Sequence, residues 1–315
     1  MEKFKNNLSP RVSVVIPTYK RPHLIGRAIK SVLNQTYQDF EIIIIDDSPD
    51  EATGKVVKDL NDKRIKYIRN KIRRGFVGAK NQGVKESNPV SKYIAFLDDD
   101  DEWLPLFLEK TIKRLEEKKD VAFVTTQPEF RLQSGERFRQ IPGKWDWNEF
   151  WNKCIGNGSV LRKEIFTKEN IWYDEKMLFE DLDFGIRISQ RFKGEFMPEV
   201  LRAYYYPLIK GESHSTSFTT ETSSEAIEYF YRKNYQIYEK AGKKALAWVH
   251  CLTGKTFCRA GKIKEGRPHL FKALKTYPRP EYLFYYLLAL FLPKSYQSHY
   301  LLILKNKIFE KWSKL

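Results

Sequence analysis

Several sequence features are scarce or missing in this chain of 315 residues. Its three cysteines, Cys154, Cys251 and Cys258, form neither a CxxC pair nor a disulfide framework, so we expect a reducing, cytoplasmic setting. No secretory signal is visible before the first apolar segment. No run reaches the about 18 apolar residues that a membrane-spanning helix needs. The sequence therefore predicts a protein that works inside the cell without crossing a membrane.

Glycine-rich phosphate loops are missing as well. The chain has neither the GxxxxGK[ST] loop of P-loop ATPases nor the GxGxxG fingerprint of dinucleotide-binding domains. An aspartate-based phosphatase would carry its acidic pair directly after the first strand, but that strand ends in Pro17. These absences indicate that a bound nucleotide would be held by carboxylates and a metal ion.

Positive charge is abundant but unevenly placed. The net charge is +16, and the stretch 225–315 alone has 18 basic and 6 acidic residues, which gives it +12. The length suits one large domain and a smaller one. We predict a catalytic domain over 1–220 and a basic, aromatic-rich helical region over 221–315.

Short apolar runs alternate with amphipathic segments in the first part of the chain. Strands are predicted at 12–16, 41–45, 65–68, 93–97 and 121–125, and helices at 22–35, 51–60, 77–86 and 105–118. Beyond Gln127 we expect a turn at 156–159, a helix at 179–192 and a strand at 204–206. The alternation is typical of a doubly wound α/β domain with a mostly parallel sheet.

Polar clusters follow three of the predicted strands. They are Pro17-Thr18-Tyr19, Asp46-Asp47 and the four consecutive aspartates Asp98–Asp101. Ligands of such sheets bind beyond the carboxyl ends of the strands, so the three clusters indicate one site. Four like charges after a buried strand favour a divalent cation with oxygen ligands. The alternative is an acidic loop in solvent, or a cap for the helix that begins near Pro105.

Taken in order along the chain, these segments resemble the motifs of family 2 glycosyltransferases. The resemblance is carried by 14–21, 31–37, 41–47, 75–83, 96–101, 156–159 and 179–181, and it covers about residues 10 to 215. It implies a Rossmann-like GT-A fold followed by a helical C-terminal region. It also implies an inverting, metal-dependent enzyme that moves a sugar from a nucleotide-diphosphate donor, usually a UDP-sugar. The acceptor would be a glycan or a lipid-linked molecule, as in the synthesis of cell-surface polysaccharide or glycoconjugates.

The resemblance also assigns residues to the donor. The implied donor-binding set is Pro17, Thr18, Tyr19, Asp47, Lys80, Asp98 and Asp99. Within it, Asp47 would hydrogen-bond the base and Tyr19 would flank it, although Tyr19 also suits a packed aromatic at the edge of the core. Lys80 stands where the family often has an arginine that meets phosphates, although a solvated helix lysine fits the pattern too.

Further residues are assigned to the metal, the chemistry and the acceptor. Asp100, in a segment like the DXD motif, would bind Mn²⁺ or Mg²⁺. His214 would be a second contact, although a solvated loop histidine fits the pattern equally well. Asp181, in a segment like the ED pair, would be the catalytic base, although acids also favour the first turn of any helix. The acceptor side would include Gly158 and Glu180. Trp145 is added because its ring suits stacking on a sugar, although an aromatic residue beside a helix also suits packing.

The basic tail leaves two interpretations open. The segment 281–292 is apolar and aromatic but too short to span a bilayer, so it suits either a packed helix or an anionic membrane surface on the cytoplasmic side. Two other functions are weighed: a non-catalytic GT-A domain that binds an anionic surface or nucleic acid, and a sugar nucleotidyltransferase. Intact Asp47, Asp100 and Asp181 argue against the first, so no nucleic acid partner is expected. A sugar nucleotidyltransferase would need a glycine-rich loop after the first strand, and residues 17–22 contain no glycine.

Overall fold

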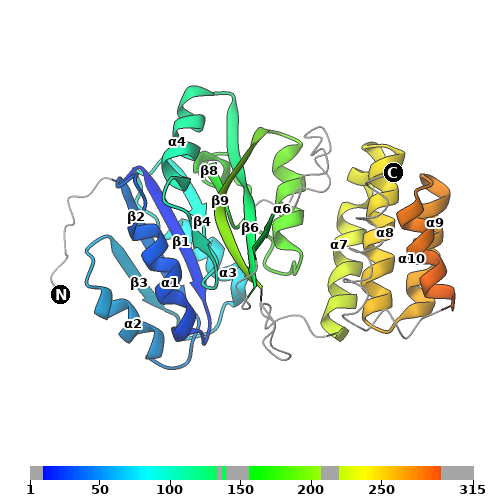
Figure 1. Cartoon of the computed structure of the whole chain (residues 1–315), viewed down its shortest axis with the longest axis horizontal. Helices are drawn as coiled ribbons and strands as arrows, with labels where there is room; N and C mark the ends of the chain where they lie inside the picture. Colours follow the sequence, from blue (N-terminus) through cyan, green and yellow to red (C-terminus); the bar gives the residue numbers. More distant parts are fainter. Residues whose placement is uncertain (1–9, 133–136, 140–155, 207–219, 292–315) are drawn as a thin grey trace. The chain divides into compact units, whose positions relative to one another are not determined.

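The structure is a computed structural model that describes residues 10–132, 137–139, 156–206 and 220–291 (Figure 1). The chain divides into two compact units. Residues 1–176 and 180–214 form the first unit, and residues 177–179 and 215–315 form the second. The predicted domain boundary near residue 220 adjoins a segment outside the described residues and stays a prediction.

A single sheet runs through the first unit. Its parallel part has the order β3-β2-β1-β4 and contains β1 (Val12–Thr18), β2 (Phe40–Asp46), β3 (Ile65–Arg69) and β4 (Tyr93–Phe96). The order then continues β8-β6-β9-β5, with β7 paired to β6. These strands are β5 (Glu102–Trp103), β6 (Val121–Leu132), β7 (Arg137–Arg139), β8 (Ser159–Arg162) and β9 (Lys193–Tyr206).

The later strands add antiparallel pairs to the mostly parallel sheet that the sequence predicts. Strand β8 lies antiparallel between β4 and β6, whereas β6 and β9 run parallel to each other. Strands β5 and β7 pair antiparallel with β9 and β6. The predicted fold class, an α/β domain with a mostly parallel sheet and a helical C-terminal region, is confirmed.

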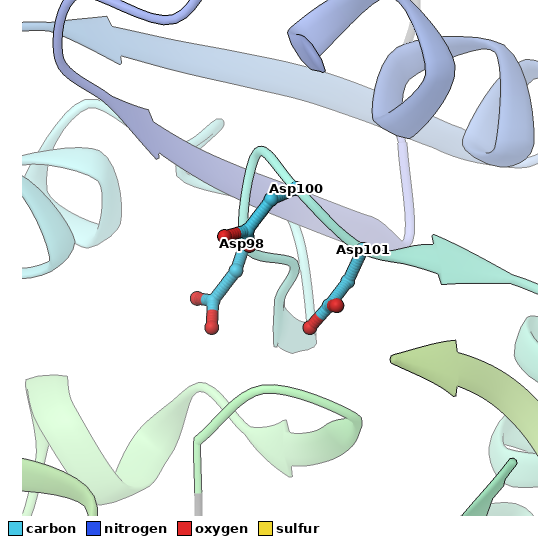
Figure 2. Close-up of side chains that lie close together, drawn as sticks. All are labelled: Asp98, Asp100 and Asp101. Carbon is cyan, nitrogen blue, oxygen red and sulfur yellow. The ribbon is translucent and has the colours of Figure 1, made fainter. Parts of the chain in front are cut away.

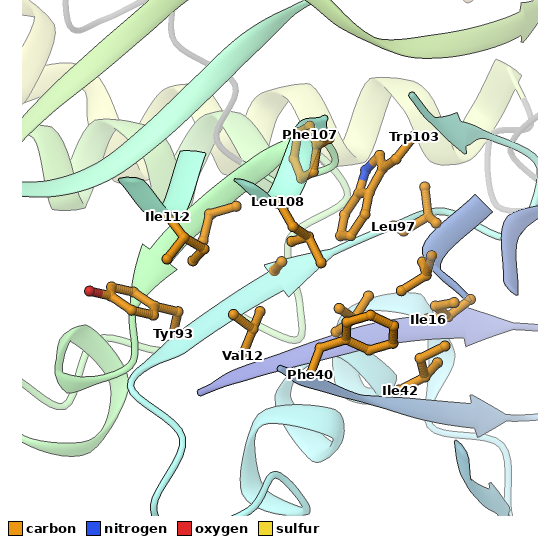
Figure 3. Packing of buried hydrophobic residues seen from close by; sticks show 14 of the residues in the cluster. Val12, Ile16, Phe40, Ile42, Tyr93, Leu97, Trp103, Phe107, Leu108 and Ile112 are labelled. Carbon is orange, nitrogen blue, oxygen red and sulfur yellow. The ribbon is translucent and has the colours of Figure 1, made fainter. Parts of the chain in front are cut away.

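Helices cover both faces of the sheet. One face is covered by α1 (Pro22–Leu33), α2 (Ala52–Leu60) and α4 (Phe107–Glu117), and the other by α3 (Gly75–Lys85), α5 (Glu164–Thr167) and α6 (Glu180–Ser189). In β1, Val12 and Ile16 pack toward the first face (Figure 3). Val14 packs toward the same face, and Val15 packs toward the second. Because strand side chains alternate between faces, a strand that is apolar at every position must be covered twice. Complete burial of each such side chain contributes roughly 1.5–3 kcal/mol.

Local sequence signals set the element boundaries. Helix α1 begins with Pro22, whose fixed φ suits the first turn of a helix. Helix α2 ends at Leu60, and the next residue, Asn61, adopts a left-handed conformation with φ of 45°. Helix α3 begins at Gly75, two residues before the predicted start, because the Asp47 carboxylate accepts hydrogen bonds from its first N–H groups.

The second unit is helical. It contains α7 (Thr220–Lys240), α8 (Lys243–Arg259), α9 (Ile263–Thr276) and α10 (Pro280–Phe291). Helix α8 packs against α7 and α9, and α9 packs against α10. Tyr282, Tyr285, Leu288 and Ala289 bury one side of α10 against this bundle. Among the residues that the structure describes, no helix is both long and apolar enough to span a bilayer.

Candidate active site

The carboxyl ends of three parallel strands lie next to one another. Thr18 is paired with Asp46 where β1 meets β2, and β1 also pairs with β4, which ends at Phe96. The polar segments after these strands therefore meet at one edge of the sheet. This edge collects Thr18, Asp47 and residues 98–101, which is where open α/β sheets bind ligands.

Three of the four consecutive aspartates gather into what we call the aspartate cluster: Asp98, Asp100 and Asp101. Each offers one carboxylate oxygen, and these oxygens lie within 4.8 Å of one another (Figure 2). Asn157 bridges two members, because its Nδ2 donates to Asp98 Oδ2 at 3.1 Å and also to Asp101 Oδ2. The second oxygen of Asp98, Oδ1, is buried and has no hydrogen-bond partner among the described residues.

The aspartate cluster has the donor set that a divalent cation requires. Burial raises the pKa of Asp98 to about 8; Lys80 opposes this rise and the charge of Asp100 adds to it. Burial also raises the pKa of Asp101, and the charge of Asp98 adds to that rise. Mg²⁺ and Mn²⁺ prefer carboxylate oxygens, and a bound cation would remove the repulsion within the cluster. The unpartnered Oδ1 of Asp98 is a free ligand atom for such an ion.

Asp99 has different partners from the other three aspartates. Its Oδ2 accepts a hydrogen bond from Thr18 Oγ1 at 2.6 Å, and its Oδ1 accepts one from the Arg21 guanidinium at 3.0 Å. The same Arg21 nitrogen lies 3.0 Å from Asp100 Oδ2. Burial raises the pKa of Asp99 to about 6, against the opposing effect of Arg21. Asp99 therefore ties the cluster to the end of β1.

The residues assigned to the nucleotide base lie at the ends of β1 and β2. Asp47 accepts a hydrogen bond from Asn70 Nδ2 at 2.7 Å and from the backbone N–H groups of Arg74 and Gly75 at 3.0 and 2.8 Å. These bonds hold its carboxylate at the first turn of α3.

Tyr19 is half-buried, and the Arg73 guanidinium lies 4.2 Å from the centre of its ring. Pro17 is buried within β1. The contacts of Pro17, Tyr19 and Asp47 with a donor stay predictions.

Lys80 joins the two acids that begin α6. Its Nζ lies 2.7 Å from Asp181 Oδ1 and 3.3 Å from Glu180 Oε1. The Lys80 side chain is 0% exposed, whereas that of Asp181 is 27% exposed. The structure thus places Lys80 beneath the acid pair, with Asp181 as the member of the ion pair that reaches solvent.

The turn before β8 connects the two acidic groups. Asn157 holds the aspartate cluster, as described above, and Gly156 lies directly against Asp181. A Cβ atom at Gly156 would fall 2.0 Å from Asp181 Oδ1, so any larger residue there would displace the Asp181 carboxylate. Gly158 has φ of +77°, and a Cβ atom there would fall 2.2 Å from the Arg202 side chain. The turn therefore brings Asp181 and the cluster to the same site.

Two predicted site residues, Trp145 and His214, lie outside the described residues, so their roles stay predictions. Two residues at the site received no role from the sequence, Arg21 and Asn157. Both lie in segments that resemble family motifs, which is the only signal that could have found them. Their partners are aspartates remote in the sequence, and no local pattern indicates such contacts.

Solved structures with a similar fold include a mannosyltransferase and S. aureus TarS. The mannosyltransferase PcManGT from Pyrobaculum calidifontis, in complex with GDP-Man and Mn²⁺, has a TM-score of 0.61 and 15% identity. The match covers 97% of this chain and 88% of that one. S. aureus TarS 1-349 in complex with UDP-GlcNAc has a TM-score of 0.52 and 15% identity, over 91% of this chain and 82% of that one.

Sequence comparison gives the family. The family model described as Glycosyl transferase family 2 matches residues 13–179. The putative colanic acid biosynthesis glycosyl transferase WcaA of Escherichia coli (strain K12) is 30% identical over 253 residues, which cover 76% of this chain and 86% of that protein. The UDP-Glc:alpha-D-GlcNAc-diphosphoundecaprenol beta-1,3-glucosyltransferase WfgD of Escherichia coli is 36% identical over 113 residues, or 36% of this chain and 44% of that protein. The chain belongs to glycosyltransferase family 2, and it is a glycosyltransferase.

Proposed function

We propose that this glycosyltransferase is inverting and metal-dependent, and that it moves a sugar from a UDP-sugar to a glycan or lipid-linked acceptor. One observation carries the proposal. The single turn 156–159 contacts both the aspartate cluster and Asp181, so a metal-held diphosphate and a carboxylate base would share one site. Such a reaction would serve the synthesis of surface polysaccharide or glycoconjugates.

The chemistry assigns a different task to each acidic group. The carboxylates of Asp98, Asp100 and Asp101 would hold Mn²⁺ or Mg²⁺, which would offset the charge of the departing diphosphate. Asp181 would accept the proton of the acceptor hydroxyl as its oxygen bonds to the anomeric carbon. The bond between that carbon and the diphosphate oxygen breaks on the opposite side, which inverts the configuration and releases the nucleoside diphosphate.

The remaining assignments concern binding. We propose that Asp47 and Tyr19 contact the base, and that Pro17, Thr18 and Asp99 shape the donor site around them. The proposed acceptor side and the extra metal contact comprise Gly158, Glu180, Trp145 and His214.

Relatives support the choice of donor and acceptor. WfgD is named as an enzyme that uses UDP-Glc and a diphosphoundecaprenol-linked sugar. A Campylobacter jejuni relative, 43% identical over 98 residues, is also named as a glucosyltransferase acting on an undecaprenol-linked substrate. Of the solved structures, TarS was solved with UDP-GlcNAc, and PcManGT with GDP-Man and Mn²⁺. A UDP-sugar, a divalent cation and a lipid-linked acceptor are therefore the first substances to test.

A lipid-linked acceptor would bring the enzyme to a membrane surface, and α10 has a face that suits this. Leu283, Leu287 and Phe291, which we call the α10 stripe, are 43%, 41% and 74% exposed at a spacing of four residues. Glu281 is the only charged residue of α10. Exposed basic residues precede the helix: Lys272, Lys275 and Arg279. We propose that the stripe enters the surface of an anionic membrane on its cytoplasmic side while the basic residues meet the lipid phosphates.

The test of the proposed function is direct. Purified protein would be incubated with a panel of nucleotide sugars, undecaprenyl-diphosphate-linked acceptors and Mn²⁺, and release of the nucleoside diphosphate would be measured. We expect release with a UDP-sugar, and its loss when EDTA removes the metal. Release that persists in EDTA would contradict metal dependence. A product that joins a nucleoside triphosphate to a sugar phosphate would favour the nucleotidyltransferase alternative, and absence of turnover with every donor would favour the non-catalytic one.

A further inference from the structure

The surroundings of Lys80 differ from those of a lysine that binds phosphate. Its ammonium group is enclosed by three aromatic rings, with Phe76, Tyr173 and Phe96 centred 4.3, 5.2 and 5.9 Å from Nζ. Ring faces attract a cation within about 6 Å. Together with the two carboxylates of α6, the rings leave none of the Lys80 side chain exposed to solvent.

The orientation of the ion pair is also informative. Asp181 Oδ1 is bound by Lys80, whereas Oδ2 has no hydrogen-bond partner among the described residues. Gly156 closes one side of this carboxylate, since a single methyl group at that position would collide with it. Asp181 is therefore held through one oxygen, and its side chain is 27% exposed.

We propose that Lys80 is a positioning residue for Asp181, which fixes the orientation and the charged state of this base, and does not bind the donor phosphates. The inference rests on the proposed role of Asp181 as the base that accepts the acceptor's proton. It replaces the expectation from family resemblance that a cation at this position meets the diphosphate.

The charge balance around Asp181 explains why a cation is needed there. The titratable groups that act on this region are Lys80 on α3, Glu180 on α6, Asp98 after β4, Tyr173 before α6 and Tyr204 on β9. Burial raises the pKa of Glu180, Lys80 lowers it, and the charge of Asp181 raises it again. Without Lys80, ionising both Asp181 and Glu180 would place two negative charges side by side. One of the two carboxyl groups would therefore stay protonated up to a higher pH.

The experiment compares Lys80→Met with Lys80→Arg, which keeps the charge. Two quantities are measured: the affinity for UDP with Mn²⁺ by calorimetry, and the dependence of kcat on pH. For Lys80→Met we expect UDP affinity within about twofold of the wild-type value. The acidic limb of the profile of kcat against pH should move to a higher pH by about 1–3 units. The rate at low pH should fall by at least about tenfold and recover as the pH rises. Lys80→Arg should keep the wild-type limb.

The opposite pattern would overturn the inference. If Lys80→Met weakens UDP binding tenfold or more and leaves the acidic limb in place, Lys80 binds phosphate. An unmoved limb with unchanged affinity would show that Lys80 is only structural. Should Lys80→Met fail to fold, Lys80→Gln combined with Glu180→Gln removes one of the two competing carboxylates, and unchanged UDP affinity is expected from it. A wild-type protein that transfers no sugar would contradict the proposed function, and the UDP affinities would still decide the role of Lys80.

Discussion

At the scale of single residues, the proposed base depends on a neighbour that has no side chain. Gly156 lies so close to Asp181 that an added Cβ would fall 2.0–2.2 Å from its carboxylate atoms. Real Cβ atoms do not approach other heavy atoms so closely, so the carboxylate would have to move. Because Lys80 binds the same carboxylate, a movement of Asp181 would disturb the ion pair between Lys80 and Asp181.

We therefore predict that Gly156→Ala lowers the transfer rate by about 10²-fold, since a displaced base loses its reach to the acceptor proton. The matched control is Gly26→Ala in α1, where the nearest atom would be Val56 Cγ1 at an ordinary 3.6 Å. The control should keep full activity and a melting temperature at or slightly above that of the wild type. Equal transfer rates for the two variants would show that Asp181 does not need its observed position.

The sequence predicted much of the site but not the different contacts of the four consecutive aspartates. The sequence indicated that Thr18, Asp47 and residues 98–101 share one site, because strand ends in a parallel sheet meet at one edge. Asp181 was added only by the resemblance to family motifs. The sequence alone could not show that Asp99 has hydrogen-bond partners different from those of the other three aspartates. That difference depends on the contacts of Asp99 with Thr18 and Arg21, which exist only in the folded chain.

At the scale of elements, the strands of the parallel sheet were predictable because each is a continuous apolar run. The predicted strand at 41–45 lies within β2, and the one at 12–16 lies within β1. The antiparallel position of β8 between β4 and β6 was not predictable. The Val160-Leu161 pair indicates a strand, but the choice of neighbours depends on contacts with residues far away in the sequence.

The helical unit depends on close approach between two helices. A Cβ atom at Gly266 in α9 would fall 2.7 Å from the Gly254 carbonyl oxygen in α8 and 2.4 Å from Cys258 Sγ. We predict that Gly266→Ala destabilises the α8–α9 pair by roughly 1–3 kcal/mol, the usual cost of overpacking. Hydrogen exchange of peptides from 243–276 would measure the loss. The same peptides should exchange at the wild-type rate in Gly26→Ala, and unchanged protection in Gly266→Ala would contradict the close packing.

At the scale of the whole molecule, positive charge concentrates in the C-terminal region, which also carries an exposed apolar helix face. The stretch 225–315 carries +12 of the net +16, and it contains the α10 stripe. Burial in the bundle accounts for one side of α10 but leaves Leu283, Leu287 and Phe291 exposed, although apolar helix faces are normally covered. The proposed membrane surface accounts for both the charge and the exposure.

We predict that replacing the three residues of the α10 stripe by serine weakens binding to anionic vesicles at least tenfold. Part of the about 1.5–3 kcal/mol per buried side chain is lost, and 1.4 kcal/mol is already tenfold. The control replaces Ile72, Val90 and Leu106, three exposed apolar residues of the first unit, by serine. Its binding should match that of the wild type and weaken as salt rises.

Co-sedimentation with anionic and neutral vesicles separates the outcomes. Wild-type protein that stays in the supernatant with anionic vesicles at low salt would contradict the membrane proposal. A stripe variant that binds vesicles normally but changes its molar mass in light scattering would assign the face to a second copy of the chain.

The central claim is that Asp181 accepts the acceptor's proton while other residues of the same site hold the donor. The most direct measurement is the single-turnover transfer rate of Asp181→Asn with saturating UDP-sugar and Mn²⁺, together with its affinity for the donor. Asparagine keeps the size of the side chain but cannot accept the proton, so the rate should fall by about 10²-fold or more while the donor affinity stays near that of the wild type. A wild-type rate in Asp181→Asn, or a collapse of donor affinity with the rate, would contradict the account.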